Sequence, residues 1–277
     1  MIARRLERGF AYLLLVVVAI IGMAPFAVIL LISTKARIDV LQVPPSLEFD
    51  IDQIVKNYRD VLITRGFLGY TWNSIVATTI SVALALVIGT PAAYAFSRIP
   101  FRGRDDWAST ILSLRFMPAV ALAIPILLMM RFLDLDNSLA GLVIPYIAFS
   151  LPLVVWILIG FFDEIPRELD DAAMVDGCTR LGVLTRVMLP LVRPGLIVAA
   201  IFAAIFIWNE FLVGLYIINS QALKTIPLGA AGLISAQRPI DWNVAATVGV
   251  VTIIPIFIFS LFIQRYIVRG ITAGAVK

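Results

Sequence analysis

The sequence predicts an all-α membrane protein with six transmembrane helices, and its composition is the first reason. Of 277 residues, 61% are hydrophobic and 14% are charged, whereas a soluble domain is about half apolar and a quarter charged. The mean hydropathy of +1.00 agrees. Because one water-soluble core cannot hide so much apolar surface, a water-soluble enzyme is nearly excluded.

Six long apolar stretches are the second reason. A helix needs about 20 apolar residues to cross a hydrocarbon core of about 30 Å. Each stretch is interrupted at most by Gly, Pro or one ionisable residue, which membrane helices tolerate. The first is too long for the apolar part of a signal peptide, so we expect it to remain as an anchor. We predict one transmembrane domain over residues 1–277, with spans at about 10–32, 73–97, 108–130, 139–162, 195–218 and 244–264.

The distribution of Lys and Arg orients these spans. With the N-terminus inside, the short inner segments hold most of the basic residues, among them Arg4, Arg102 and Arg180. The outer basic residues lie mainly in one long segment, at about 33–71, which holds as many acids. Basic inner loops are typical of membrane proteins, so we expect both termini to be cytoplasmic. The net charge of +4 is explained in this way, and no patch indicates nucleic-acid binding.

The rare residue types exclude several kinds of site. The sequence has no histidine, which removes His-based metal sites and Ser-His dyads. Its one cysteine cannot close a disulfide within the chain. We therefore expect neither a catalytic nor a metal site.

The segment at about 163–194, between the fourth and fifth spans, is cytoplasmic in this topology. Pro166 suits the first turn of a helix, and acids follow it at the positive end of the helix dipole. Gly177 can adopt the left-handed conformation that ends a helix. A second helix should follow, with a one-sided apolar stripe at Leu181, Leu184, Met188 and Leu191. We expect a short acidic helix that projects into the cytosol and an amphipathic helix along the membrane.

This segment resembles the EAA motif of ATP-binding-cassette (ABC) importer permeases. The similarity consists of Pro-x-Glu-x-x-Asp-Ala-Ala-x-x-Asp-Gly followed by Leu-Pro about a dozen residues later. Asp171 stands where the family usually has Glu, and Cys178 where Ala is common. Residues 91–103, the run Trp208-Asn209-Glu210-Phe211-Leu212 and the C-terminal tail are similar to the carbohydrate, maltose-type branch of the family.

The resemblance implies a type I ABC-importer transmembrane domain in a bacterial cytoplasmic membrane. The helix from about Pro166 to Asp176 would be the coupling helix, seated in a separate ATP-binding subunit. The partners would be a second, non-identical permease, two ATP-binding subunits and an extracellular solute-binding protein. The implied coupling residues are Glu168, Asp170, Asp171, Ala172, Ala173, Asp176 and Gly177.

The sequence agrees that this chain is not the ATPase. Gly177 and Gly182 have the glycine spacing of a phosphate-binding loop, but Val183 stands where such a loop needs lysine. We therefore expect no cofactor on this chain, with ATP and Mg²⁺ on the partner.

Ionisable residues inside spans are costly and usually face a cavity or a partner. Arg115 and Glu210 are two such residues, and Trp208 and Asn209 precede Glu210. An aromatic face with amide and carboxylate groups suits a sugar, so we expect these four residues to border the solute path. Alternatively, Glu210 pairs with an arginine or with the partner permease and only stabilises the helix bundle.

Two other functions remain as alternatives. One is import of another organic solute, such as a glycerol-phosphate, for which Arg115 is the single cation in the path. The other is a stand-alone secondary carrier, although such carriers usually show paired hydropathy repeats and broken helices at the midplane.

Overall fold

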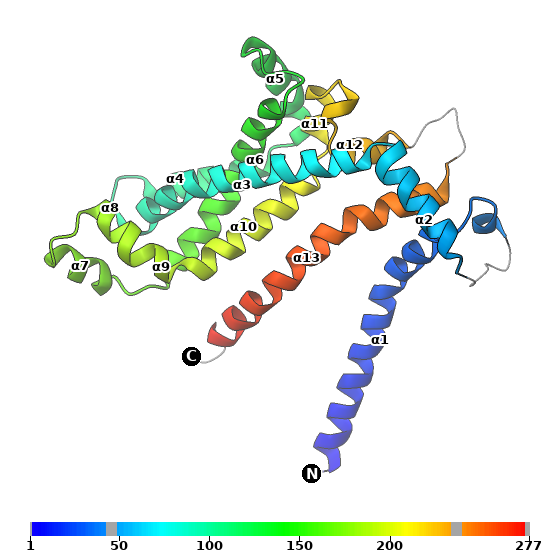
Figure 1. The fold of residues 1–277 in the computed structure, drawn as a ribbon. Coiled ribbons are helices and arrows are strands. Elements are labelled where there is room, and N and C mark those ends of the chain that lie inside the picture. The colour runs from blue at the N-terminus through cyan, green and yellow to red at the C-terminus, as the bar shows by residue number, and fades with distance from the viewer. Residues whose placement is uncertain (1, 43–48, 234–239, 275–277) are drawn as a thin grey trace. The chain divides into compact units, whose positions relative to one another are not determined.

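The structure, a computed structural model, describes residues 2–42, 49–233 and 240–274, with side chains over 9–42, 49–233 and 240–262 (Figure 1). Every element in these ranges is a helix. In chain order they are α1 (Ile2–Ser33), η1 (Asp39–Leu41), α2 (Ile51–Arg59), η2 (Asp60–Thr64), α3 (Phe67–Arg98), α4 (Arg104–Ser113), η3 (Leu114–Phe116), α5 (Ala119–Phe132), α6 (Leu139–Asp163), α7 (Glu168–Val175), α8 (Arg180–Gly182), η4 (Val183–Met188), α9 (Leu189–Leu191), α10 (Arg193–Trp208), α11 (Leu212–Ile217), η5 (Gln221–Leu223), α12 (Ile226–Ala231) and α13 (Trp242–Gly274).

Four of these helices are long and apolar enough to cross a membrane as single pieces. They are Gly9–Ser33 within α1, α3, α6 and Trp242–Phe262 within α13. Two bent pairs, α4–α5 and α8–α10, raise the number of candidate spans to as many as six. These helices confirm the predicted all-α membrane fold.

The predicted third and fifth spans are not continuous helices, contrary to expectation. In the third, the axes of α4–η3 and α5 differ by 94°. The break lies at Met117 and Pro118, because Met117 is extended, as residues before proline usually are, and Pro118 lacks an amide hydrogen. In the fifth, α10 ends at Trp208 and α11 begins at Leu212. The bend of 79° in this region lies before α10, near Val192.

The chain divides into two compact units, Met1–Leu68 with Ala230–Pro255, and Gly69–Gly229 with Ile256–Lys277. In the first unit, the Asn57 side chain donates to the carbonyl oxygens of Ser33 and Lys35 at 2.9 and 2.8 Å. Asp241, which precedes α13, pairs with Arg37 at 2.9 Å. Most apolar side chains of α1 from Phe10 to Leu30 are exposed, which suits a hydrocarbon environment. The single-domain organisation expected above stays a prediction.

The second unit holds two clusters of buried apolar side chains. One joins α3, α6, α7 and η4 through residues such as Tyr94, Leu158, Phe162 and Met188. The other joins α5, α6 and α11 and includes Tyr146. Gly195 of α10 packs closely against Phe161 of α6. A Cβ atom added to Gly195 would lie 2.5 Å from the Cγ atom of Phe161. The 163–194 segment and the broken fifth span are therefore fastened to one core.

Candidate functional site

The predicted coupling helix is α7, which runs from Glu168 to Val175 within the predicted range of 166–176. In the first turn, the carbonyl oxygen of Pro166 accepts a hydrogen bond from the amide of Leu169. At the other end, Gly177 has a φ of +88°. The amide of Gly177 donates to the carbonyl oxygen of Met174, and the amide of Cys178 donates to that of Ala173. These two hydrogen bonds form a Schellman motif. The predicted glycine stop is confirmed.

Asp170 is buried, contrary to the expectation of an acidic helix that projects from the membrane domain. It is 6% exposed, and its carboxylate accepts a hydrogen bond of 2.9 Å from the Tyr94 hydroxyl. The Nε atom of Arg98 lies 3.1 Å from the other carboxylate oxygen. Ala173, one turn later, is buried in the same core. The reason is that Asp170 and Ala173 are three residues apart and share the inner face of the helix.

The remaining predicted coupling residues lie on the exposed side of α7 and at its end. They are Glu168, Asp171, Ala172, Asp176 and Gly177. Apolar side chains lie among them, because Leu169 is 41% exposed and Val175 is 87% exposed. Leu181, at the start of the following helix, is 69% exposed. The outer surface of this segment is thus acidic with apolar side chains at its tip.

Arg98, at the end of α3, is a structural residue that we did not predict from the sequence. Its Nη2 atom donates to the carbonyl oxygens of Phe162 and Ile165 at 2.7 and 2.6 Å. The preceding Ser97 donates to Asp163 at 2.5 Å. Arg98 therefore ties the end of α3 to the end of α6 and to α7. The four-residue spacing of Tyr94 and Arg98 puts both on one helix face, the signal that was available in the sequence.

The predicted amphipathic stripe of the second helix is wrong at its two ends. Leu184 and Met188 are buried as expected, but Leu181 is 69% and Leu191 48% exposed. The cause is the π-helical segment η4, whose wider turn changes the periodicity of the buried face. Val183 and Val192 take the inward positions instead.

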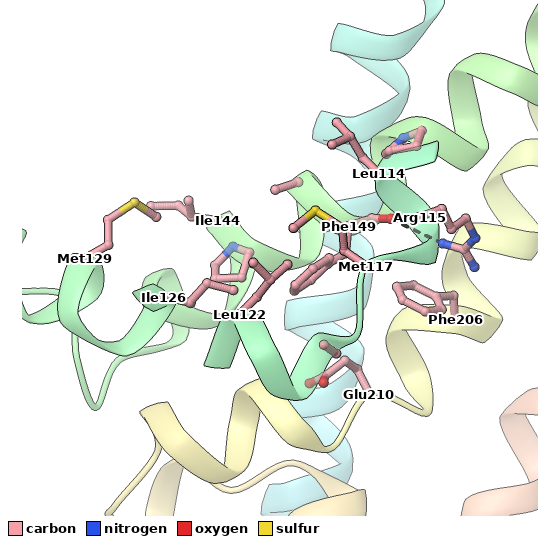
Figure 2. Close-up of a pocket in the computed structure, with 14 residues that line it drawn as sticks. Leu114, Arg115, Met117, Leu122, Ile126, Met129, Ile144, Phe149, Phe206 and Glu210 are labelled. Carbon is pink, nitrogen blue, oxygen red and sulfur yellow. Dashed lines mark hydrogen bonds between the residues drawn. The ribbon is translucent and has the colours of Figure 1, made fainter. Parts of the chain in front are cut away.

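Within the second unit, Arg115 and Glu210 line one pocket of about 420 Å³ (Figure 2). Its other walls are almost entirely apolar: Leu114, Met117, Ala119, Leu122, Ile126, Met129, Ile144, Pro145, Ala148, Phe149, Pro152 and Phe206. The break at Met117–Pro118 forms one side of the pocket. The break after α10 places Glu210 at the pocket. Residues at both interruptions of the predicted spans therefore line this pocket.

The two ionisable side chains are held in different ways. The Arg115 guanidinium lies 4.4 Å from the centroid of the Phe206 ring and donates to the Phe149 carbonyl at 3.3 Å. The Glu210 carboxylate accepts from the amides of Val213 and Gly214 at 2.9 and 3.4 Å. It therefore stabilises the free N-terminus of α11, where a negative charge is favourable.

The structure brings together two of the four predicted path residues and not the other two. Trp208 is 2% exposed and lies outside the pocket lining. The exposed Asn209 donates its side-chain amide to the Ile205 carbonyl at 2.7 Å. In the described part of the chain, Glu210 forms no ion pair, with Arg115 or any other cation. The alternative of an arginine partner within these residues is thus not supported.

Known proteins are similar to this chain in sequence and in fold. Binding-protein-dependent transport system inner membrane components match residues 85–273. The sulfoquinovosyl glycerol transport system permease protein SmoH of Agrobacterium fabrum is 36% identical, over 92% of this chain and 89% of its own length. The trehalose/maltose transport system permease protein MalG of Thermococcus litoralis is 34% identical, over 95% and 94%.

The fold is also similar to that of a solved structure. A chain of a bacterial ABC transporter involved in the import of the acidic polysaccharide alginate superposes with a TM-score of 0.78. It is 24% identical, and the match covers 95% of this chain and 97% of that one. The match over residues 85–273 and the two relatives together show that this chain belongs to the family of binding-protein-dependent transport system inner membrane components.

Proposed function

We propose that this chain is one of two permease subunits of an ATP-driven importer that carries a sugar, polyol or related glycan across the inner membrane. The single observation that carries the solute class is the set of relatives, which are named for sulfoquinovosyl glycerol and for trehalose and maltose. They match more than nine-tenths of this chain, so the likeness is not confined to one motif.

The importer would be completed by a second, non-identical permease, two ATP-binding subunits and an extracellular solute-binding protein. ATP and Mg²⁺ would bind to the ATP-binding subunits and not to this chain. The exposed acids and the apolar tip of α7 support this role, because an apolar centre with a polar rim is a typical docking surface. Glu168, Asp171, Ala172 and Val175 are the side chains that we assign to the contact.

Movement of the ATP-binding subunits would be transmitted to the membrane helices by the contacts that hold α7 to them. The buried Asp170–Arg98 ion pair and the Arg98 bonds to the end of α6 join α7 to α3 and α6. A helix fastened in this way shifts together with the helices that hold it. In this proposal, Asp170, Ala173 and Gly177 act by positioning α7, whereas the exposed residues make the contact.

For the solute path we propose the pocket of Arg115 and Glu210. Phe206 offers a ring face of the kind that packs on the C–H surface of a sugar, and Glu210 offers carboxylate oxygens. Arg115 also favours a second candidate, an organic solute with an anionic group such as a glycerol-phosphate. The proposed topology places both termini and the 163–194 segment in the cytoplasm.

The experiment is reconstitution of the complete importer in proteoliposomes. Trehalose, maltose, sulfoquinovosyl glycerol, glycerol 3-phosphate and an alginate oligosaccharide serve as probes. We expect uptake of a carbohydrate only when ATP, the ATP-binding subunits and the binding protein are all present. Uptake by the purified permease without the ATPase would contradict the proposal and favour a secondary carrier. Uptake of glycerol 3-phosphate alone would favour the second candidate.

A further inference from the structure

The two ionisable side chains of the pocket, Arg115 and Glu210, differ in how much of their hydrogen-bonding capacity the protein uses (Figure 2). Arg115 lies in η3, just before the break of the third span, and Glu210 lies between α10 and α11. Within the residues that the structure describes, neither side chain forms an ion pair. The capacity that each one leaves available therefore indicates which groups of a solute the pocket can bind.

Arg115 keeps most of its donors available. A guanidinium carries five N–H donors. Among the described residues, its one hydrogen-bond acceptor is the carbonyl oxygen of Phe149, 3.3 Å from Nη1. The ring of Phe206, whose centroid lies 4.4 Å from the guanidinium carbon, attracts the cation through its face and uses none of the N–H donors in the guanidinium plane. The guanidinium can therefore form two parallel hydrogen bonds to a carboxylate, sulfonate or phosphate group.

Glu210 has the opposite charge, but the protein already compensates part of it. One carboxylate oxygen accepts from the amide of Val213 at 2.9 Å, and the other accepts from the amide of Gly214 at 3.4 Å. Both amides belong to the start of α11, where the helix dipole stabilises a negative charge. Each carboxylate oxygen keeps a second lone pair, which can accept from a hydroxyl group. Glu210 therefore suits a hydroxyl group of the solute and does not require a cation.

The remaining walls restrict which solute can occupy the space between these two side chains. Apart from Arg115 and Glu210, all twelve lining residues have apolar side chains. A neutral sugar would leave several hydroxyl groups against these walls without partners, which is costly. A hydrogen bond between Arg115 and an anionic group is roughly twice as strong as a neutral one and offsets part of this cost. The volume of about 420 Å³ lies in the range of about 300–1,000 Å³ that is typical of pockets for small organic ligands.

We propose that this pocket selects a sugar or glycoside that carries an anionic group, which Arg115 binds while Glu210 accepts a hydrogen bond from a hydroxyl group. This inference rests on the proposed function and narrows its solute class. Arg115 determines the preference, because a neutral sugar gives the guanidinium no counter-charge. Phe149 and Phe206 are positioning residues, since they orient the guanidinium. An inorganic anion alone would leave Glu210 without a hydroxyl partner and most of the pocket unfilled.

The test measures binding to the complete importer in nanodiscs, without nucleotide and without the solute-binding protein, whose own selectivity would otherwise contribute. The probes are methyl glucoside and three analogues that carry a carboxylate, a sulfonate or a phosphate at C6. Equilibrium dialysis gives a dissociation constant for each probe. We expect at least one anionic analogue to bind at least about tenfold more tightly than methyl glucoside, and the three analogues identify which anionic group is preferred.

Substitutions of Arg115 assign this preference to the pocket. Arg115→Gln should abolish it, because the amide can still donate to Phe149 but carries no charge. Arg115→Lys keeps the charge and loses the two parallel hydrogen bonds, so the preference should fall about threefold. The readout is the ratio of the dissociation constants for the neutral and anionic probes, since a structural defect would weaken both alike. Arg131→Gln is the matched control, because Arg131 is exposed and lies outside the pocket lining, and its ratio should equal that of the wild type.

Several results would overturn the inference. They are equal binding of the neutral and anionic probes by the wild type, absence of binding of all four probes, and a ratio that the substitutions of Arg115 do not change. Should Arg115→Gln fail to assemble, the ratio of Arg115→Lys decides. Equally tight binding of glycerol 3-phosphate would overturn the assignment of a sugar to this pocket and favour the second candidate. ATP-dependent uptake of a neutral carbohydrate would leave the proposed function intact after any of these results, whereas absence of all carbohydrate uptake would overturn the proposed function itself.

Discussion

The carboxylate of Asp170 lies 3.1 Å from the Nε atom of Arg98, and both side chains are almost completely buried. The pair joins α7, the proposed coupling helix, to the C-terminal end of α3. A buried ion pair depends on both members, because removal of one leaves an uncompensated charge in a poorly hydrated site. This relationship makes the fastening of α7 directly testable.

Asp170→Asn should destabilise the protein by about 3 kcal/mol, because Arg98 loses its counter-charge while the amide keeps only the Tyr94 bond. The matched control is Asp171→Asn, the exposed neighbour on the same helix, which should change stability by less than about 0.5 kcal/mol. Denaturant unfolding in detergent micelles measures both. Equal losses for the two variants would mean that the ion pair does not hold the helix.

Gly177→Ala should destabilise the end of α7 by about 1–2 kcal/mol, because the residue has a φ of +88° and a Cβ atom there is strained. No other atom lies within 4 Å of the added Cβ, so steric contact makes no contribution. Gly182→Ala is the control, since Gly182 has helical backbone angles and ordinary contacts. Hydrogen exchange of residues 168–178 reports the difference. Similar exchange in both variants would show that the cap is not needed.

Gly195→Ala should destabilise the packing of α10 on α6 by about 1–3 kcal/mol, because the added Cβ lies 2.5 Å from the Cγ of Phe161. Gly22→Ala in α1 provides the comparison, as nothing lies within 4 Å of its Cβ. That variant should be neutral or slightly stabilising, because alanine is the better helix former. Thermal unfolding in the same detergent distinguishes them, and an unchanged midpoint for Gly195→Ala would contradict the close packing.

Substitutions of Glu210 test the pocket, because their effects on stability and on transport can be measured separately. Glu210→Gln keeps an oxygen that can accept from the Val213 amide, so assembly with the ATPase should persist. Glu210→Ala removes this cap of α11 and should cost about 1 kcal/mol of stability. If the carboxylate contacts the solute, the Gln variant loses most ATP-dependent uptake in membrane vesicles. Undiminished uptake by an assembled Gln variant would reduce Glu210 to a structural residue.

The start and the end of α7 were predictable, because each depends on local chemistry. Proline at a helix start, acids in the first turn and glycine in the left-handed conformation need no information from distant parts of the chain. Which face of α7 is buried was not predictable, because Asp170 and Asp171 are the same residue type in neighbouring positions. Only the approach of Arg98 and Tyr94 makes one of them buried.

The membrane class and the positions of the long helices follow from composition and apolar length, since the cost of exposing backbone in a bilayer leaves few other structures. Long-range packing determines the pocket and the hydrogen bonds between distant segments, which the hydropathy of the sequence does not indicate. The third span breaks at Met117–Pro118 through the local effect of proline, and α10 ends before Glu210, but only long-range packing brings the two breaks together in one pocket. Long-range packing also gives the Asn73 side chain its partner, the carbonyl oxygen of Ala222, because a hydrogen bond between distant segments depends on how the chain folds and leaves no periodic pattern in the residues themselves.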